Sequence, residues 1–276
     1  MKYSNAVKGL LLILAFPLGA WGGAAFCPNA ISHPMPPVLE RFQGLEDAMF
    51  RSSAAQGDVF LVEQTILQGA GVNRVHAWRN RTALHDAALE GHGEVIDVLL
   101  RHQAEIDVRD QFGYTPLALA AWIGHLEVAV RLLQGGADPH ARENDGCSIL
   151  YIAARRGHAV IVECLLGAGL DPQNGMVNGL TALHVAALNG HLNVVETLVY
   201  AGANLWVQDP IGRTAIDYAE QFGHPKVVAF LEEIINLQAM QALFNEEDIG
   251  ERPELLDAAV DFDVGGCFGM PDWGSL

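Results

Sequence analysis

The sequence has few basic residues. Sixteen Lys and Arg stand against 33 Asp and Glu, which gives a net charge of −17. Nucleic acids and anionic lipid surfaces both need a basic face on the protein that binds them, so this composition argues against either as the ligand. An acidic surface suits a basic protein partner, and plain solubility explains it equally well.

Cysteine is scarce as well, with only Cys27, Cys147, Cys164 and Cys267. No two of them form a CxxC pair, so the sequence has neither a zinc knuckle nor a thioredoxin-type motif. Four cysteines in a chain of 276 residues do not make a disulfide framework, although a bridge between Cys27 and Cys267 stays open. We expect Cys147 to be exposed, and Cys164 to be an inert buried thiol in place of a core leucine.

Catalytic motifs are missing too. The sequence contains no Gly-x-Ser-x-Gly elbow, no P-loop and no dinucleotide-binding fingerprint. No Ser-His-Asp or Cys-His arrangement has a supporting motif, and no pair of carboxylates is marked out as acid and base. We therefore expect no catalytic residue, no cofactor and no enzymatic activity.

What the chain does have, at its start, is an apolar segment. Lys2 and Lys8 precede the apolar run 9–16, and small residues follow as far as Ala25. This order is typical of a secretory signal peptide over residues 1–25, and it predicts export to a periplasm or to the exterior. An uncleaved membrane anchor over residues 9–26 is one alternative. A lipid on Cys27 is another, against which the bulky Phe26 argues.

The main feature of the chain is a repeat of 33 residues. Thr82, Thr115, Ser148, Thr181 and Thr214 recur at this spacing. In every copy an apolar residue follows two positions later, an alanine five positions later, and a Gly-His pair closes the segment. Five copies in the same register are a specific signal of a repeat protein.

Each copy predicts two short helices. The Thr or Ser hydroxyl caps the first helix, and the glycine ends it. The second helix has apolar residues on one side, as in the run from Val95 to Leu100. A Gly-Ala-Asp type of turn and an extended loop then lead to the next Thr.

The segment Thr82-Ala83-Leu84-His85-Asp86-Ala87-Ala88, with its copy at 181–187, resembles the signature of the ankyrin-repeat family. The resemblance implies an all-α repeat solenoid of helix-turn-helix units joined by extended hairpin loops. We expect six units, at about residues 45–81, 82–114, 115–147, 148–180, 181–213 and 214–235. The first and last depart from the pattern and are expected to be caps, since terminal repeats need a polar outer face.

Segments outside the repeats have other compositions. Residues 26–44 contain four prolines between 28 and 37 and are expected to be an extended linker. Residues 231–244 continue the last unit as an amphipathic helix that can extend the cap. Residues 236–276 form an acidic, partly flexible extension. A tail that binds a basic partner, or folds back on the repeats, is the functional alternative for this extension.

Histidine is frequent, with eleven in the chain, but its placement does not indicate a metal site. Five histidines share the Gly-His position, one in each copy, at 92, 125, 158, 191 and 224. Residues a whole repeat apart cannot share one ion at zinc–nitrogen bonds of about 2 Å. We expect these rings, together with His85 and His184, to hydrogen-bond to the loop backbone.

The informative residues are those that the repeat does not need. In ankyrin-like stacks, the loop tips and the inner face of the first helices form a concave surface that binds partners. Aromatic and arginine side chains, the types enriched in binding hot spots, gather at these positions. The predicted partner-binding residues are Trp78, Arg79, Arg81, Phe112, Tyr114, Trp122, Ile123, Arg155, Arg156, Leu188 and Arg213, with Val177, Leu180 and Ile211 beside them.

These residues predict a basic and aromatic groove in an otherwise acidic protein. Such a groove suits a partner protein that presents acidic and apolar side chains. The resemblance therefore implies a non-enzymatic protein–protein interaction module or scaffold, expected to be a monomer, and the segment 1–25 predicts that this module is exported. Three alternatives stay open: an accessory protein that regulates or protects another exported protein, an effector that acts in another cell, and an enzyme with its site in the tail or at a cap.

Overall fold

The structure, a computed structural model, describes residues 37–76, 79–175 and 178–247. The chain divides into two units, residues 1–43 and 44–276, and each is described by itself. Of the first unit only residues 37–43 are described, and they belong to the beginning of a helix. The predicted signal peptide, its two alternatives, and the Cys27–Cys267 bridge all lie outside the described residues.

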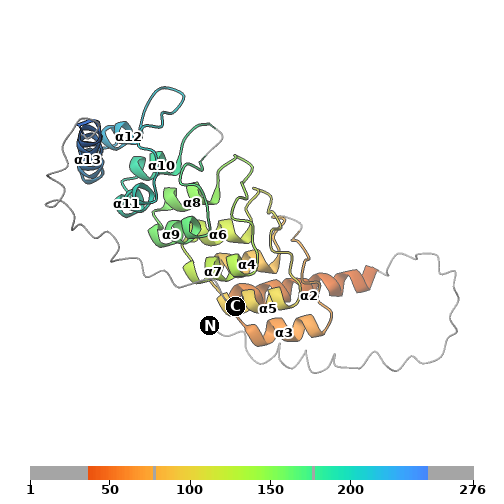
Figure 1. The fold of residues 1–276 in the computed structure, drawn as a ribbon. Helices are drawn as coiled ribbons and strands as arrows, with labels where there is room; N and C mark the ends of the chain where they lie inside the picture. The colour runs from red at the N-terminus through yellow and green to blue at the C-terminus, as the bar shows by residue number, and fades with distance from the viewer. Residues whose placement is uncertain (1–36, 77–78, 176–177, 248–276) are drawn as a thin grey trace, which may run out of the picture. The chain divides into compact units, whose positions relative to one another are not determined.

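The described residues form twelve helices in six pairs and no extended strand (Figure 1). This confirms the predicted all-α repeat solenoid. The pairs are α2 (Pro37–Gln56) with α3 (Val59–Leu67), α4 (Ala83–Glu90) with α5 (Gly93–Arg101), α6 (Pro116–Ile123) with α7 (Leu126–Gln134), α8 (Ile149–Arg156) with α9 (Ala159–Gly167), α10 (Ala182–Leu188) with α11 (Leu192–Tyr200), and α12 (Ala215–Gln221) with α13 (Pro225–Glu247).

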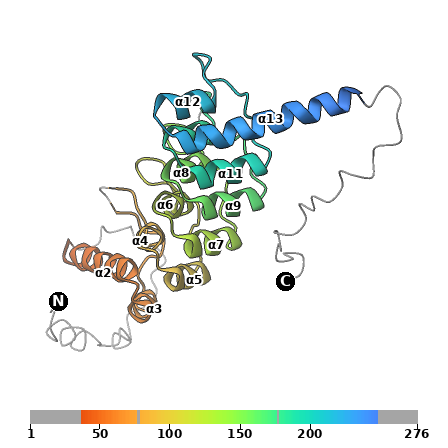
Figure 2. The ribbon, with the colours of Figure 1, turned by 90° about the vertical axis from the view of Figure 1, so that its left-hand side faces the viewer.

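The helices lie in two layers. The first helices α4, α6, α8, α10 and α12 contact one another in order, and so do the second helices from α3 to α13 (Figures 1 and 2). The loops between successive pairs extend away from the helices as hairpins. Single β-bridges, Arg142 with Ser148 and Gly175 with Thr181, close two of these hairpins.

The first helices begin where the repeated Thr or Ser stands. The Ser148 hydroxyl accepts a hydrogen bond from the Tyr151 amide at 3.1 Å, and Thr115 accepts one from Ala118 at 3.2 Å. Each bond satisfies an amide that has no partner inside its own helix. Pro116 follows Thr115, at the first helical position, where the missing N–H costs nothing.

The two layers bury different patterns of residues. In α8 every residue from Ile149 to Ala154 is buried, because this helix packs between α6 and α10 as well as against its own partner. The paired alanines, such as Ala153 and Ala154, have no exposed surface, and their small side chains let neighbouring helices approach closely. The second helices bury one side only, for example Val128, Ala129 and Leu132 of α7.

The glycine and histidine of successive units contact each other. Gly91 has a φ of 85°, and a Cβ atom there would come within 2.8 Å of the His125 ring of the next unit. His125 Nε2 donates to the Leu89 carbonyl at 3.0 Å, and His92 donates in the same way to Ala55 at 3.0 Å. The prediction that these histidines bond to loop backbone is therefore corrected, since the acceptors lie at the ends of the preceding unit's first helix.

Two boundaries differ from the sequence prediction. Helix α2 begins at Pro37, so residues 37–44 of the predicted linker 26–44 are helical. A proline at the first helical position is compatible with a helix, and the residues after it are mostly helix formers. At the other end, α13 continues without a break past residue 235 to Glu247.

The cysteines also differ from expectation. Cys147 is buried, because the hairpin folds it under the start of α8, and burial raises the pKa of its thiol to about 12. Cys164 is only half-buried, because it lies toward the outer side of α9, and burial raises its pKa as well. Within residues 37–76, 79–175 and 178–247, no helix is long and apolar enough to cross a membrane.

Candidate functional site

The predicted binding residues lie on two parts of the stack. One part is the tips of the hairpin loops, where Phe112 and Ile211 are exposed. The other is the C-terminal ends of the first helices, where Trp122 and Arg156 lie. Both locations agree with the repeat pattern, because a side chain at a loop tip or at the end of a first helix is not required to contact another unit.

Trp122 and Arg156 form a pair across two units. The Arg156 guanidinium lies 5.0 Å from the centre of the Trp122 ring, and its Nε donates to the Trp122 carbonyl at 3.1 Å. Trp122 remains 37% exposed and Arg156 is exposed, so both can contact a partner. A stacked Arg and Trp present a flat apolar face with a positive edge.

The Trp122 carbonyl stands at the position that accepts a hydrogen bond from the Gly-His histidine of the next unit elsewhere in the stack. His158 stands opposite Trp122 as His125 stands opposite Leu89, but its buried Nε2 has no hydrogen bond within the described residues. Burial is the main cause that lowers the pKa of His158. At the interface between α6 and α8 the Trp122 carbonyl thus lies beside both His158 and Arg156, and the Arg156 Nε donates to it at 3.1 Å.

Arg155 connects the two parts of the surface. Its side chain is exposed, and its positive charge lies close enough to Tyr114 and Cys147 to act against the rise of their pKa values. Burial and a hydrogen bond to Glu143 raise the pKa of Tyr114, so the phenol stays neutral. Tyr114 is half-buried and shared between scaffold and surface.

Arg81 and Arg213 have structural partners. Arg81 Nε donates to Asp110 at 3.2 Å, and the Asp110 carboxylate also accepts from the amides of Phe112 and Tyr114. Arg213 binds Asp209 in the same fashion. These two arginines neutralise carboxylates that hold the hairpins in shape, so they add less positive charge to the surface than the sequence suggests.

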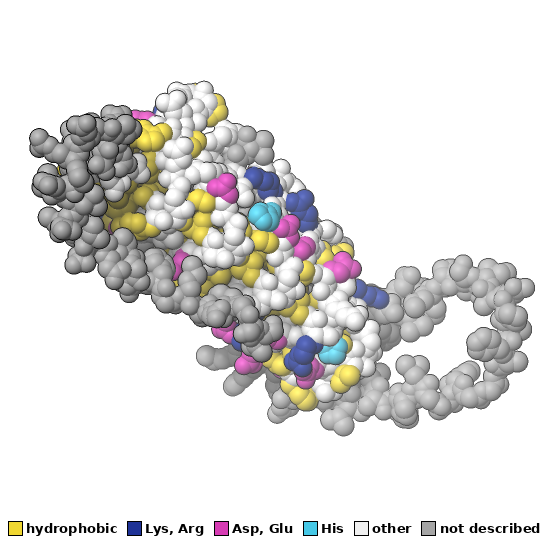
Figure 3. Space-filling model, viewed as in Figure 1, with side chains coloured by type: hydrophobic (Ala, Val, Ile, Leu, Met, Phe, Trp, Pro, Cys, Tyr) yellow, Lys and Arg dark blue, Asp and Glu magenta, His cyan; other side chains and the backbone are white. Residues whose placement is uncertain are grey.

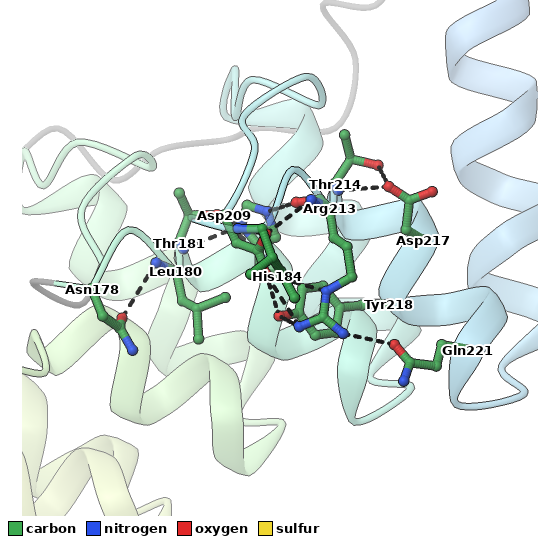
Figure 4. A network of polar contacts seen from close by, with 11 residues as sticks. Asn178, Leu180, Thr181, His184, Asp209, Arg213, Thr214, Asp217, Tyr218 and Gln221 are labelled. Atoms are coloured by element: carbon green, nitrogen blue, oxygen red, sulfur yellow. Dashed lines mark hydrogen bonds and ion pairs between the residues drawn. The ribbon is translucent and has the colours of Figure 1, made fainter.

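The Asp209 network is the most developed of these hairpin anchors (Figure 4). The Tyr218 hydroxyl donates to Asp209 at 2.7 Å, and the amides of Ile211 and Arg213 donate at 2.9 Å. Burial opposes ionisation of Asp209, but these hydrogen bonds outweigh it and lower its pKa. The Arg213 guanidinium lies 4.2 Å from the Tyr218 ring centre, and it donates to Gln221.

The remaining predicted residues divide by burial. Ile123, Leu180 and Leu188 are half-buried, whereas Arg79 is exposed on its loop. Trp78 and Val177 lie outside the described residues. The structure adds Trp206, which is 59% exposed on the loop before α12. An alignment of the repeats can find it, because Asp107, His140 and Gln173 stand at the equivalent positions.

The surface that these residues form is chemically mixed. Among the described residues no group of three or more His, Cys, Asp or Glu side chains is arranged to hold a metal ion. On the face seen in Figure 3, basic side chains lie beside acidic side chains and histidine, with apolar side chains between them. Such a mixed, open surface is suited to contact with another macromolecule.

Comparison with known proteins agrees with this architecture. Residues 50–143, 124–209 and 150–241 match the family described as ankyrin repeats (3 copies). A segment of 65 residues is 38% identical to serine/threonine-protein kinase 12 of Arabidopsis thaliana and covers 24% of this chain and 14% of that protein. A segment of 65 residues is 40% identical to potassium channel AKT1 of Oryza sativa subsp. indica and covers 24% of this chain and 7% of that protein.

A third relative is protein phosphatase 1 regulatory subunit 27 of Mus musculus, 34% identical over 75 residues. That match covers 27% of this chain and 48% of the relative. The matched segments span less than half the length of each of these relatives. What the relatives share with this chain is therefore a segment and not a whole protein.

Proposed function

We propose a function from the premise that this chain belongs to the ankyrin-repeat family. Ankyrin stacks are protein–protein interaction modules and are typically non-enzymatic. For this chain the proposal is that a partner protein binds the loop tips and the C-terminal ends of the first helices, with contacts centred on Trp122, Arg155 and Arg156. The paired Trp122 and Arg156 are the observation that carries the proposal.

The chemistry of this surface favours a particular partner. Arg155 and Arg156 are exposed, and no ion pair to either is present in the described part of the chain. Phe112 is 53% exposed, and Trp122 offers an aromatic face. A partner segment with carboxylates beside apolar side chains can pair with the arginines while it covers both rings.

A pull-down with the chain as bait tests the proposal. The variant combines Phe112→Ala, Trp122→Ala and Arg155→Ala, whose side chains make no hydrogen bond or ion pair among the described residues, although the Trp122 ring contacts Arg156. Hot-spot residues contribute about 2 kcal/mol or more each, so the captured partner should bind at least about 30-fold more weakly. The matched control combines Leu126→Ala and Val160→Ala, which are exposed on second helices. Equal capture of the same protein by the wild type and the triple variant rejects this surface.

The proposal also places the protein outside the cytoplasm, on the strength of the segment 1–25. Sequencing of the amino terminus of protein recovered from the exported fraction tests this. A new terminus between Ala20 and Cys27 supports a cleaved signal peptide, whereas an intact Met1 supports the anchor over residues 9–26. Recovery of the whole protein from the cytoplasm contradicts export.

A further inference from the structure

The chain continues beyond the last described helix with an acidic tail. Helix α13 ends at Glu247, and residues 248–276 follow it. This tail has seven acidic residues and Arg252 as its one basic residue. Within it, residues 260–264, Val-Asp-Phe-Asp-Val, alternate carboxylates with apolar side chains. The tail therefore contains the combination of side chains that the proposed partner presents.

The surface formed by Phe112, Trp122, Arg155 and Arg156, named the Trp122 surface, carries positive charge that the stack does not neutralise. Both arginines are exposed, and neither has an ion pair among the described residues. Arg156 donates to the Trp122 carbonyl through Nε, which leaves the outer edge of its guanidinium for a carboxylate. Glu143, an acidic side chain of the same region, is half-buried and accepts a hydrogen bond from a neighbouring tyrosine.

The length of the chain decides which part of the tail can reach this surface. Short connections, such as residues 157–158, make the two helices of each pair antiparallel, so α13 begins near the C-terminal ends of the first helices and runs away from them. Its 23 residues advance about 35 Å, and α8 lies two units away from α12 at about 10 Å per unit. The tail therefore has to return over roughly 40 Å.

Two tail segments combine two carboxylates with apolar side chains, and they differ in reach. Residues 254–257, Glu-Leu-Leu-Asp, lie within ten residues of Glu247 and reach at most about 36 Å, at no more than about 3.6 Å per residue. Residues 260–264 begin 13 residues after Glu247 and reach about 43–60 Å. Because the path passes around the stack, the first segment falls short and the second does not.

We propose that residues 260–264 of the chain's own tail dock on the Trp122 surface and compete there with the partner protein. Asp261 and Asp263 pair with the two arginines, and Phe262 covers the exposed aromatic face. This inference rests on the proposed function, because it assigns an internal competitor to the same surface. The partner binds only when it displaces the tail.

A tethered segment needs little affinity of its own to remain docked. A short flexible connection gives an effective concentration of about 1 mM, so a segment with a dissociation constant of about 0.1 mM as a free peptide is docked for about nine-tenths of the time. The apparent affinity of the partner then falls about tenfold, since only the undocked fraction can bind it. Salt should weaken the docking, because it screens the charged pairs.

A distance measurement between two spin labels on the full chain tests the docking. One label is attached to the chain's own Cys267, and the other to Val160→Cys, which is exposed at the start of α9 and lies outside the Trp122 surface. Cys27 and Cys164 are replaced by serine, whereas Cys147 is buried and stays unlabelled. We expect a single narrow distance peak, because a docked tail holds Cys267 at a fixed place.

A tail variant shows whether the proposed segment is responsible. The variant Asp261→Asn with Phe262→Ser and Asp263→Asn leaves the stack unchanged, and it should replace the narrow peak with a broad distribution. The matched control removes two carboxylates and one apolar side chain from residues 254–257 and should keep the peak. Its substitutions are Glu254→Gln, Leu255→Ser and Asp257→Asn. A broad distribution in the wild type overturns the proposal, as does a narrow peak that survives in the tail variant.

Dilution shows whether the tail docks on its own molecule. An excess of unlabelled chain, about tenfold, should leave the peak unchanged when tail and surface belong to one molecule. Loss of the peak on dilution means that the tail of a second copy occupies the surface, and it contradicts the proposal.

A synthetic peptide of residues 257–266 separates a failure of this proposal from a failure of the proposed function. It should bind the tail variant about tenfold more tightly than the wild type, whose surface is occupied. Adding Arg155→Ala and Arg156→Ala to the tail variant should abolish this binding. Arginine-dependent binding of equal strength to tail variant and wild type overturns the docking, but it leaves the proposed partner-binding surface intact. A peptide that binds neither protein argues against both.

Discussion

At the scale of single residues, the repeated Gly-His pair holds neighbouring units together. The glycine ends its helix with a positive φ, and the absence of a Cβ leaves room for the histidine of the next unit. That histidine then donates to a carbonyl at the end of the same helix. The pair therefore has two linked roles, since the histidine can reach the carbonyl only because the glycine has no side chain.

Three substitutions to alanine separate these effects. Gly91→Ala combines a φ of 85° with a Cβ that meets the His125 ring, whereas Gly202→Ala has a φ of 87° and nothing within 4 Å. Gly167→Ala, in α9, has neither a positive φ nor a neighbour within 4 Å. We expect Gly202→Ala to lower the free energy of unfolding by about 1–2 kcal/mol, Gly91→Ala by clearly more, and Gly167→Ala to raise it by up to about 1 kcal/mol.

Urea unfolding of the three variants beside the wild type checks this order. The control is built in, because Gly91 and Gly202 have nearly equal φ and differ in the histidine contact. Equal losses in Gly91→Ala and Gly202→Ala would mean that the ring moves aside without cost.

His85 and His184 link stability to pH. Nδ1 of each ring accepts from the backbone amide of the capping Thr, at 3.1 Å for His85 and 3.2 Å for His184, and Nε2 donates to a carbonyl of the next hairpin. Burial is the main cause that lowers the pKa of both rings below the ordinary value of 6.5. An imidazolium has no lone pair left for the Thr amide, so the folded state holds these rings neutral.

The sign of the pH effect follows from proton binding. Below pH 6.5 the unfolded chain takes up protons that the folded chain does not, so the free energy of unfolding falls as the pH falls. The loss is at most about 1.4 kcal/mol per ring per pH unit. Urea unfolding between pH 5 and 8 measures it, and the double variant His85→Gln with His184→Gln should flatten the profile. An unchanged slope in that variant would assign the effect to other groups.

At the scale of elements, none of the eight-residue first helices is long enough to be stable by itself. Caps and packing determine them. The Thr or Ser cap sets where each helix begins, and the buried alanines allow two neighbours to contact it closely. The second helices are stabilised by the apolar side chains that they bury on one side. Their outer side faces solvent and can carry polar residues.

Helix α7 allows this to be tested within one element. Leu132 has no exposed surface, so Leu132→Ala should lower the free energy of unfolding by about 2–5 kcal/mol through lost burial and a cavity. Leu126, in the same helix, is exposed, and Leu126→Ala should change it by less than about 0.5 kcal/mol. Thermal unfolding followed by circular dichroism gives both values. Similar losses at the two positions would mean that α7 does not pack as described.

At the scale of the whole stack, each unit contacts its neighbours and little else. Ion pairs and hydrogen bonds connect successive units, as Arg51 with Asp86, Arg81 with Asp110 and Arg131 with Asp97. Stability in such a protein is approximately a sum of units and nearest-neighbour interfaces. The central units have two such interfaces, and the terminal units have one.

Amide hydrogen exchange should therefore follow the order of the units. We expect α6, α8 and α10 to exchange at least about tenfold more slowly than α3 and α12, which corresponds to about 1.4 kcal/mol of opening free energy. Mass spectrometry of the intact stack, digested after exchange, resolves the helices. Equal protection along the whole stack would indicate that it opens only as a single unit.

The sequence by itself determined the repeat, its period and the helix pairs, because capping, glycine and apolar spacing are local signals that recur five times in the same register. It also marked Trp122, Arg155 and Arg156 as residues that the scaffold does not need. Only the tertiary structure decided what lies beside them. Arg81 proved to be bound to Asp110, which lies in the next hairpin, about 30 positions away. Arg213 proved to be bound to Asp209, which lies across a turn of its own hairpin. Local signals in the sequence specify neither partner. The burial of Cys147 and the exposure of Leu237 and Met240 have the same origin, because both depend on which unit covers a side chain.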